Sequence, residues 1–279
     1  MKLINCLLAL MMFSITATAQ EDKKEQKSDQ AIMLNTDGFH YEKNMHGKNK
    51  KEKSIDVTFA ALDLGVTTLQ DNTNYATPLA AAQLQVPSVQ RNSSLFDLRT
   101  EKSMNVNIWP ILGKGRLLKT TNQKIYLSTG VGVQIYNFRY ANGIDYVPNG
   151  PTLQGVGSSP ITYDNTNFKK NKLVVAYLSV PLNITLKTRM ANKLWLVYGF
   201  GITGGFRVNS YTKQISDLYG KKREHGNFNL NQFNSAVTAE FGLDNYFRLY
   251  ASYQLTNMYN DVSGLDQHPF CIGLRFGGI

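Results

Sequence analysis

The chain has 279 residues, and its 30 lysines and arginines exceed its 20 aspartates and glutamates to give a formal net charge of +10 at pH 7. Two cysteines, Cys6 and Cys271, are too few for a disulfide framework. The basic residues are spread along the chain instead of following one helix, so no nucleic-acid partner is expected.

Residues 1–19 have the pattern of a secretory signal peptide. Lys2 is followed by an apolar stretch, and Ala17-Thr-Ala19 is a small-x-small cleavage site. The alternative is an uncleaved membrane anchor, but the stretch is shorter than the roughly 20 residues that a membrane-spanning helix needs. We therefore expect an exported protein with a cleaved signal peptide.

Residues 20–53 are polar and are predicted to form a disordered periplasmic lead-in. His40 and His46 lie there without a helix or cysteines to complete a metal site, so no metal is expected. Residues 199–204 match the dinucleotide motif G-x-G-x-x-G. Strand-like alternation continues past this motif to Arg207, where a cofactor site would need a helix, so no cofactor is expected.

Residues 54–279 contain eight segments in which apolar and polar residues alternate, as in membrane strands. The last of them puts Phe270, Ile272 and Leu274 on one face and Cys271 and Gly273 on the other. Pro181 lies within the fourth segment and requires a bulge or an unpaired N–H position. The predicted strands are 55–69, 95–109, 124–138, 172–187, 193–207, 231–243, 246–257 and 269–276.

The gaps between these segments alternate in length. The long gaps are 70–94, 139–171, 208–230 and 258–268, and the short ones are 110–123, 188–192 and 244–245, although 110–123 slightly exceeds the last long gap. This rhythm predicts an all-β fold, an eight-stranded antiparallel transmembrane β-barrel with long extracellular loops and short periplasmic turns. A soluble sandwich or lipocalin is the alternative. Aromatic residues near the strand ends are predicted to form interfacial girdles: Trp109, Phe138, Tyr140, Trp195, Tyr246 and Phe276.

Charged residues also occur on the predicted lumen faces. Because an unpaired charge in a narrow interior is costly, we expect them to pair across strands as a polar plug, with Glu240 contacting Arg248 or Arg275. An eight-stranded interior is just filled by side chains, which argues against an open pore. A narrow path for ions or protons remains the alternative. The predicted lumen charges are Asp63, Arg99, Glu101, Lys187, Arg207, Glu240, Arg248 and Arg275.

The outer loops are rich in basic residues. At the level of the outer leaflet these residues are expected to attract the phosphate groups of lipid A. The alternative is that they are solvated loop charges. The candidates are Lys169, Lys170, Lys213, Lys221, Lys222 and Arg223.

A hydrolase or acyltransferase site at the rim, acting on lipid A or surface peptides, is a further alternative. It would need His225 or His268 to meet a serine or carboxylate. Such groups are nearby in sequence, but a triad is a spatial arrangement and polar loops contain these residues in any case. We therefore expect no catalytic residues. The neighbouring groups are Asp217 and Glu224, and Asp261, Ser263 and Asp266.

Four segments, 61–66, 177–182, 204–213 and 270–276, resemble the PorT-like outer-membrane β-barrel family of Bacteroidetes-type bacteria. The resemblance covers strand patterns and no catalytic motif. It implies an eight-stranded outer-membrane barrel, in a family in which the activity of most members is unassigned. Our own expectation from the sequence is a barrel that acts through its loops in surface interaction, adhesion or envelope assembly. Some relatives are linked to a secretion system, so the implied partners are outer-membrane lipid and envelope or secretion-system proteins.

Overall fold

The computed structural model describes residues 30–35, 38–43, 55–148, 159–190, 194–244 and 246–277. The predicted signal peptide, 1–19, lies outside the described residues. The lead-in predicted to be disordered contains two short strands, β1 (Gln30–Asn35) and β2 (Gly38–Lys43). β2 pairs with the first barrel strand through Phe39–Phe59 and His40–Thr58.

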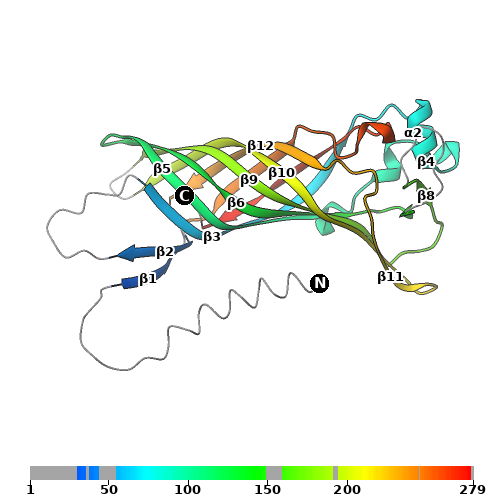
Figure 1. The fold of residues 1–279 in the computed structure, drawn as a ribbon, viewed down its shortest axis with the longest axis horizontal. Coiled ribbons are helices and arrows are strands. Elements are labelled where there is room, and N and C mark those ends of the chain that lie inside the picture. Colours follow the sequence, from blue (N-terminus) through cyan, green and yellow to red (C-terminus); the bar gives the residue numbers. More distant parts are fainter. Residues whose placement is uncertain are drawn as a thin grey trace, which may run out of the picture. The chain divides into compact units, whose positions relative to one another are not determined.

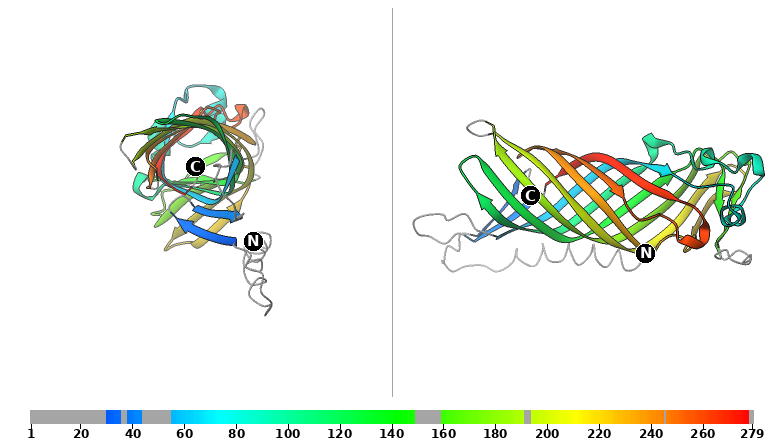
Figure 2. Two further views of the ribbon diagram at one scale, coloured as in Figure 1. Left: turned by 90° about the vertical axis from the view of Figure 1, so that its left-hand side faces the viewer. Right: turned by 90° about the horizontal axis from the view of Figure 1, so that it is seen from above.

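Eight strands close into a ring, which confirms the predicted fold (Figure 2). Each strand pairs antiparallel with its two neighbours in the order β3-β14-β13-β12-β10-β9-β6-β5, and a β3–β5 ladder closes the ring. The strands are β3 (Ile55–Asp71), β5 (Met104–Lys119), β6 (Gln123–Arg139), β9 (Lys170–Arg189), β10 (Trp195–Ser216), β12 (Phe233–Leu243), β13 (Arg248–Gln254) and β14 (Gln267–Phe276).

The connections differ in length at the two ends of the ring. At one end, called here the turn end, the connections are 120–122, 190–194 and 244–247. At the other, the loop end, they are 72–103, 140–169, 217–232 and 255–266. The predicted alternation of short and long connections is confirmed, and the exception at 110–123 disappears because β5 extends to Lys119.

The predicted strand 95–109 is wrong in position. Residues 93–96 and 100–102 form the 3₁₀ turns η2 (Ser93–Phe96) and η3 (Thr100–Lys102), and β5 begins at Met104. β5 then continues through Pro110, which has no N–H to donate. The pairing with β6 shifts register between Ile108 and Ile111, so a bulge removes Pro110 from the ladder.

Pro181 is tolerated within β9 in a different way. It pairs with Thr203 of β10, and the ladder to β6 resumes in the same register on both sides of it, at Leu182 and Ser179. No bulge is therefore needed. Of the two alternatives, the unpaired N–H position is the one found.

Large apolar side chains form an exposed belt around the outside of the ring. One row across three strands, Leu182–Ile202–Val237, has exposed fractions of 46%, 56% and 39%. A continuous apolar belt of this kind is unfavourable in water and is covered by lipid in a membrane barrel. Other members are Leu64, Val66, Ile108, Val131, Leu178, Val180, Phe200, Phe206, Val208, Phe241, Leu249, Phe270, Ile272 and Phe276.

The long connections at the loop end form a folded cap, a feature that was not predicted from the sequence. The cap contains α2 (Pro78–Gln83), η1 (Ser88–Gln90) and η4 (Asp261–Ser263), and a small sheet of β4 (Leu84–Gln85), β8 (Ile161–Tyr163) and β7 (Ile144–Tyr146). Figure 1 shows α2, β4 and β8 gathered at one end of the barrel. No helix among the described residues is long and apolar enough to cross a membrane.

The cap has a hydrophobic core that continues into the barrel. Its members come from all four long connections and pack against aromatic side chains of β6 and β9. Two residues predicted to form interfacial girdles, Phe138 and Tyr140, are buried in this core, whereas Tyr246 and Phe276 are exposed as expected. The core includes Leu84, Val86, Leu95, Phe96, Ile144, Tyr146, Ile161, Phe228, Leu230, Met258, Tyr259 and Leu265.

Candidate functional site

Four charged side chains meet inside the barrel and form what we call the lumen network: Asp63, Glu240, Arg248 and Arg275. Arg275 donates from Nε and Nη2 to the two carboxylate oxygens of Asp63, at 2.6 and 2.9 Å. Its Nη1 donates to Glu240 Oε2 at 3.1 Å, and Arg248 Nη1 donates to the same oxygen at 3.4 Å. All four residues are buried.

Neutral donors complete the lumen network. Asp63 Oδ2 accepts from Trp109 Nε1 at 2.8 Å and from Asn107 Nδ2 at 3.2 Å. Glu240 Oε1 accepts from the Thr185 hydroxyl at 2.9 Å. The four charges cancel, and each carboxylate has several donors, as a buried ion pair requires. Trp109 is therefore a lumen residue and not part of an interfacial girdle.

The other predicted lumen charges do not join the lumen network, although Lys187 and Arg207 lie on the inner side of their strands, opposite the buried Val197 and Tyr177. Lys187 forms a separate ion pair with Asp244 near the turn end, with 2.6 Å between Nζ and Oδ1. Arg207 bonds the cap connection 227–232, donating from Nε to the Asn231 carbonyl at 3.1 Å. Arg99 and Glu101 precede β5 in the cap, so their predicted place on the lumen face is wrong.

The backbone of Gly132 lies very close to the Trp109 ring, so a substitution at Gly132 tests the packing around the lumen network. A Cβ atom at Gly132 would overlap the Trp109 ring and the Ile108 carbonyl, and the bond to Asp63 holds that ring in place. We expect Gly132→Ala to lower the free energy of unfolding by about 1 to 3 kcal/mol. Urea titration in micelles measures the change. The control is Gly204→Ala, where a Cβ meets nothing within 4 Å, and equal effects at both glycines would contradict the expected packing.

Four cations form a row on the outer face near the loop end, called here the basic row: Arg139, Lys172, Lys213 and Arg223. The ladders place Arg139 opposite Lys172, Lys172 opposite Lys213, and Lys213 opposite Arg223 of β11 (Gly220–His225). In the next row Lys170 and Lys221 flank Ile215. Arg139 and Lys172 were not among the phosphate contacts predicted from the sequence, because they lie in strands β6 and β9 and the prediction considered the outer loops.

A bulge places the third member of the basic row outside. On β10 the exposed apolar residues are even-numbered up to Val208, and the register to β9 shifts between Arg207 and Asn209. Beyond the bulge, Thr212 and Gln214 are buried on the inner face, so Lys213 faces outward.

Of the six predicted phosphate contacts, only Lys213 and Arg223 belong to the basic row. Lys170 and Lys221 lie in the next row, and Lys169 and Lys222 are paired with carboxylates. Lys169 pairs with Asp217, with 2.5 Å between Nζ and Oδ1. Lys222 lies opposite the inward-facing Gln214 and pairs with Glu224 at 3.2 Å and Asp145 at 4.0 Å. Burial raises the pKa of Asp145, while the Lys222 charge opposes this shift. The predicted phosphate contacts therefore do not share one face, because Lys222 lies on the inner side of β11 and Arg223 on its outer side.

Three tyrosine hydroxyls join separate parts of the cap. Tyr146 lies between Tyr140 and Tyr259, with oxygen–oxygen distances of 2.6 and 2.7 Å. Burial raises the pKa of Tyr146 and Tyr259 well above the ordinary value of tyrosine, so these hydroxyls stay protonated. They therefore tie the 140–169 and 255–266 connections together as a rigid unit.

The rim histidines do not assemble a triad with the predicted groups. Both ring nitrogens of His268 are engaged, with Nε2 2.9 Å from Asp266 Oδ1 and Nδ1 2.9 Å from the Gln254 carbonyl oxygen. Ser263 is buried and donates to the Asn260 carbonyl. Nδ1 of His225 lies 3.3 Å from Asn209 Oδ1. Within the described part of the chain, no group of three or more histidine, cysteine and acidic side chains has the arrangement of a metal site.

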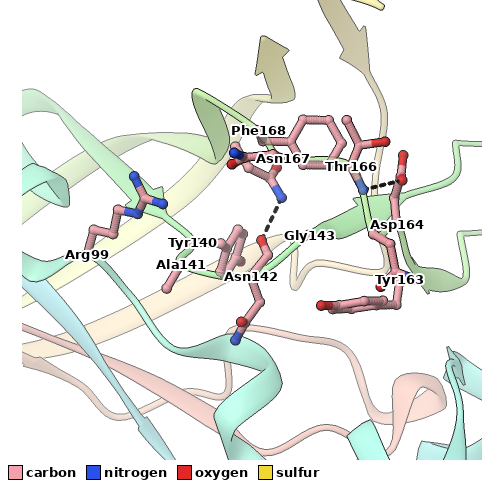
Figure 3. A pocket seen from close by; sticks show the side chains of 12 residues that line it. Arg99, Tyr140, Ala141, Asn142, Gly143, Tyr163, Asp164, Thr166, Asn167 and Phe168 are labelled. Carbon is pink, nitrogen blue, oxygen red and sulfur yellow. Dashed lines mark hydrogen bonds between the residues drawn. The ribbon is translucent and has the colours of Figure 1, made fainter. Parts of the chain in front are cut away.

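A small polar pocket of about 140 Å³ lies in the cap (Figure 3). The side chain of Asn171 forms part of the pocket wall, and its Nδ2 donates to the carbonyls of Asn142 and Ile144 at 3.0 and 2.7 Å. Asp164 accepts from the Thr166 N–H at 2.8 Å. Arg99 provides its cationic side. Asn171 and Asp164 are thus bonded within the wall itself.

No family model and no curated protein matches the chain. Among solved structures it is similar to Ail, the attachment invasion locus protein of Yersinia pestis, at 8% identity over 79% of this chain and 97% of that one, with a TM-score of 0.27. Another Ail structure contains the heparin analogue sucrose octasulfate, with 8% identity, 79% and 97% coverage and a TM-score of 0.25. A porin mutant of Rh. blastica has 9% identity over 80% and 99% of the chains and a TM-score of 0.18. At these scores the assignment of a barrel rests on the strand ladders of this chain.

Proposed function

We propose that the protein is an integral outer-membrane β-barrel with a closed lumen, and that it presents its cap at the cell surface for surface interaction, adhesion or envelope assembly. The observation that carries this proposal is the buried, neutral lumen network inside a ring whose outer face is apolar. A polar interior and an apolar exterior are the arrangement of a membrane barrel and the reverse of a soluble one.

The connection lengths support an orientation. Outer-membrane barrels have short periplasmic turns and longer extracellular loops. We therefore assign the turn end to the periplasm and the loop end, with the cap, to the outside. The cap is bonded internally by the three tyrosines and has its own core, so it offers a fixed shape to a partner.

The closed lumen favours this function over a channel. An ion passing through would have to displace Arg275 from two carboxylates, and the cap core covers the loop end of the same lumen. The geometry around His225 and His268 gives the rim-enzyme alternative no support, and we propose a non-enzymatic role. The resemblance of four strand segments supports placement in the PorT-like family, with envelope or secretion-system proteins as partners of the cap.

Fractionation and conductance test the proposal together. We expect the protein in the outer-membrane fraction, with a gel mobility that changes on boiling as it does for folded barrels. Reconstituted in a planar bilayer, the folded protein should show no stable conductance steps because the lumen network fills the interior. Recovery in the soluble periplasm would contradict the membrane placement, and steady open-pore steps would contradict the closed lumen.

A further inference from the structure

We propose that the basic row binds the phosphate groups of lipid A in the outer leaflet. This inference rests on the proposed membrane placement, and it names the lipid that the outer face recognises. Four cations on adjacent strands stand directly opposite one another, which is the arrangement that cross-strand pairing normally avoids. An external anion is needed to offset their repulsion.

The chain itself supplies little compensation. Within the described residues, no salt bridge is formed by Lys172, Lys213 or Arg223. The positive charge of Lys172 is repelled by those of Lys170, Lys213, Arg139 and Arg223. The negative charge of Glu101 acts on Arg139, at one end of the row. The centre of the row therefore keeps its positive potential, and a phosphate is the complementary group.

Two contacts fix the ends of the row in place. Arg223 lies over the Tyr211 ring, with 3.8 Å from Cζ to the ring centroid. Arg139 donates from Nη2 to the Lys169 carbonyl at 2.5 Å. Because both guanidinium groups are already held, less side-chain entropy is lost when an anion binds.

The height of the row above the apolar belt fits a headgroup. Val208, with 54% of its surface exposed, is the last strongly exposed apolar residue on β10, and Lys213 follows it by five positions. That separation is about 16 Å along the strand and about 12 Å along the barrel axis at a tilt near 45°. Lysine and arginine side chains at this level can extend back toward the membrane. Tyr211 lies between the apolar belt and the basic row, at the level where interfacial tyrosines are found.

The test measures binding of bisphosphorylated lipid A to the folded full-length protein in zwitterionic micelles. The row variant is Lys172→Gln, Lys213→Gln and Arg223→Gln together. Each cation near a charged surface contributes about fivefold to the attraction, so the row variant should bind about 100-fold more weakly at low salt. The difference should shrink as the Debye length falls from about 30 Å at 0.01 M to about 8 Å at 0.15 M salt.

A matched variant removes three other charges: Lys102→Gln, Lys169→Gln and Lys222→Gln. Each of these lysines is paired with a carboxylate outside the row, so net charge falls equally while the row stays intact. This variant should retain binding. If the row variant does not fold, as judged by heat modifiability, single Lys172→Gln and Lys213→Gln variants should each lose about fivefold.

Two further arms identify the ligand group. Lipid A without phosphates should bind the unaltered protein as weakly as the row variant binds the intact lipid, and inorganic phosphate should compete poorly. Equal binding by the row and matched variants, no preference for the phosphorylated lipid, or competition by inorganic phosphate at the affinity of the lipid would each overturn the inference. Those outcomes leave membrane placement standing, whereas a soluble protein in fractionation would remove both.

Discussion

Glu240→Gln is expected to lower the free energy of unfolding by about 3 to 5 kcal/mol. The substitution keeps the shape of the side chain but removes the carboxylate that both Arg248 and Arg275 contact. Among the four residues of the lumen network, two positive charges then face one negative charge in a narrow interior, which is far more costly than the loss of an exposed ion pair. Urea titration of the barrel in micelles, followed by the heat-modifiability gel, measures the difference.

The matched control for this prediction is Asp217→Asn. Its partner Lys169 is 65% exposed and Asp217 itself is 83% exposed, so the same chemical change should have little effect there. A second variant, Glu240→Gln with Arg248→Met, restores neutrality and should recover part of the lost stability. Equal losses in the single and double variants would show that the charge balance of the lumen network is not what stabilises it.

The lumen network was largely predictable because strands alternate with a fixed period. Asp63, Glu240, Arg248 and Arg275 each lie on the polar face of a regular strand, so side-chain direction follows from position in the sequence. Their pairing also follows, because neutral charge and a narrow lumen leave few partners. Arg99 and Glu101 show where the same reasoning fails. Their alternation imitates a strand, but they lie in and beside the 3₁₀ turn η3.

The basic row was only partly predictable, for two physical reasons. Its members come from four strands, and the register that aligns Arg139 with Lys172 and Lys172 with Lys213 is set by long-range pairing. The bulge after Arg207 also reverses which positions of β10 face outward. A one-residue bulge leaves no clear mark in a polar segment, so the loop cations could be proposed as a group but not divided between faces.

Leu274→Arg carries the second large expected effect, because it places a charge in the exposed apolar belt. Leu274 pairs with Leu249 of β13 and Leu64 of β3, whose exposed fractions are 51% and 37%. An arginine on the lipid-facing side of a membrane barrel costs about 2 to 4 kcal/mol at the bilayer midplane and less toward the interfaces. We therefore expect a loss of up to that size in the free energy of unfolding, measured by urea titration in lipid vesicles.

The matched control for the belt is Leu218→Arg. Leu218 is 72% exposed in the connection between β10 and β11, at the loop end and outside the belt. There the arginine stays in water and should change stability little. The two substitutions are chemically identical, so a difference between them reports the surroundings of each leucine. If both variants unfold at the same urea concentration as the unaltered protein, lipid does not cover the belt and the ring does not span a membrane.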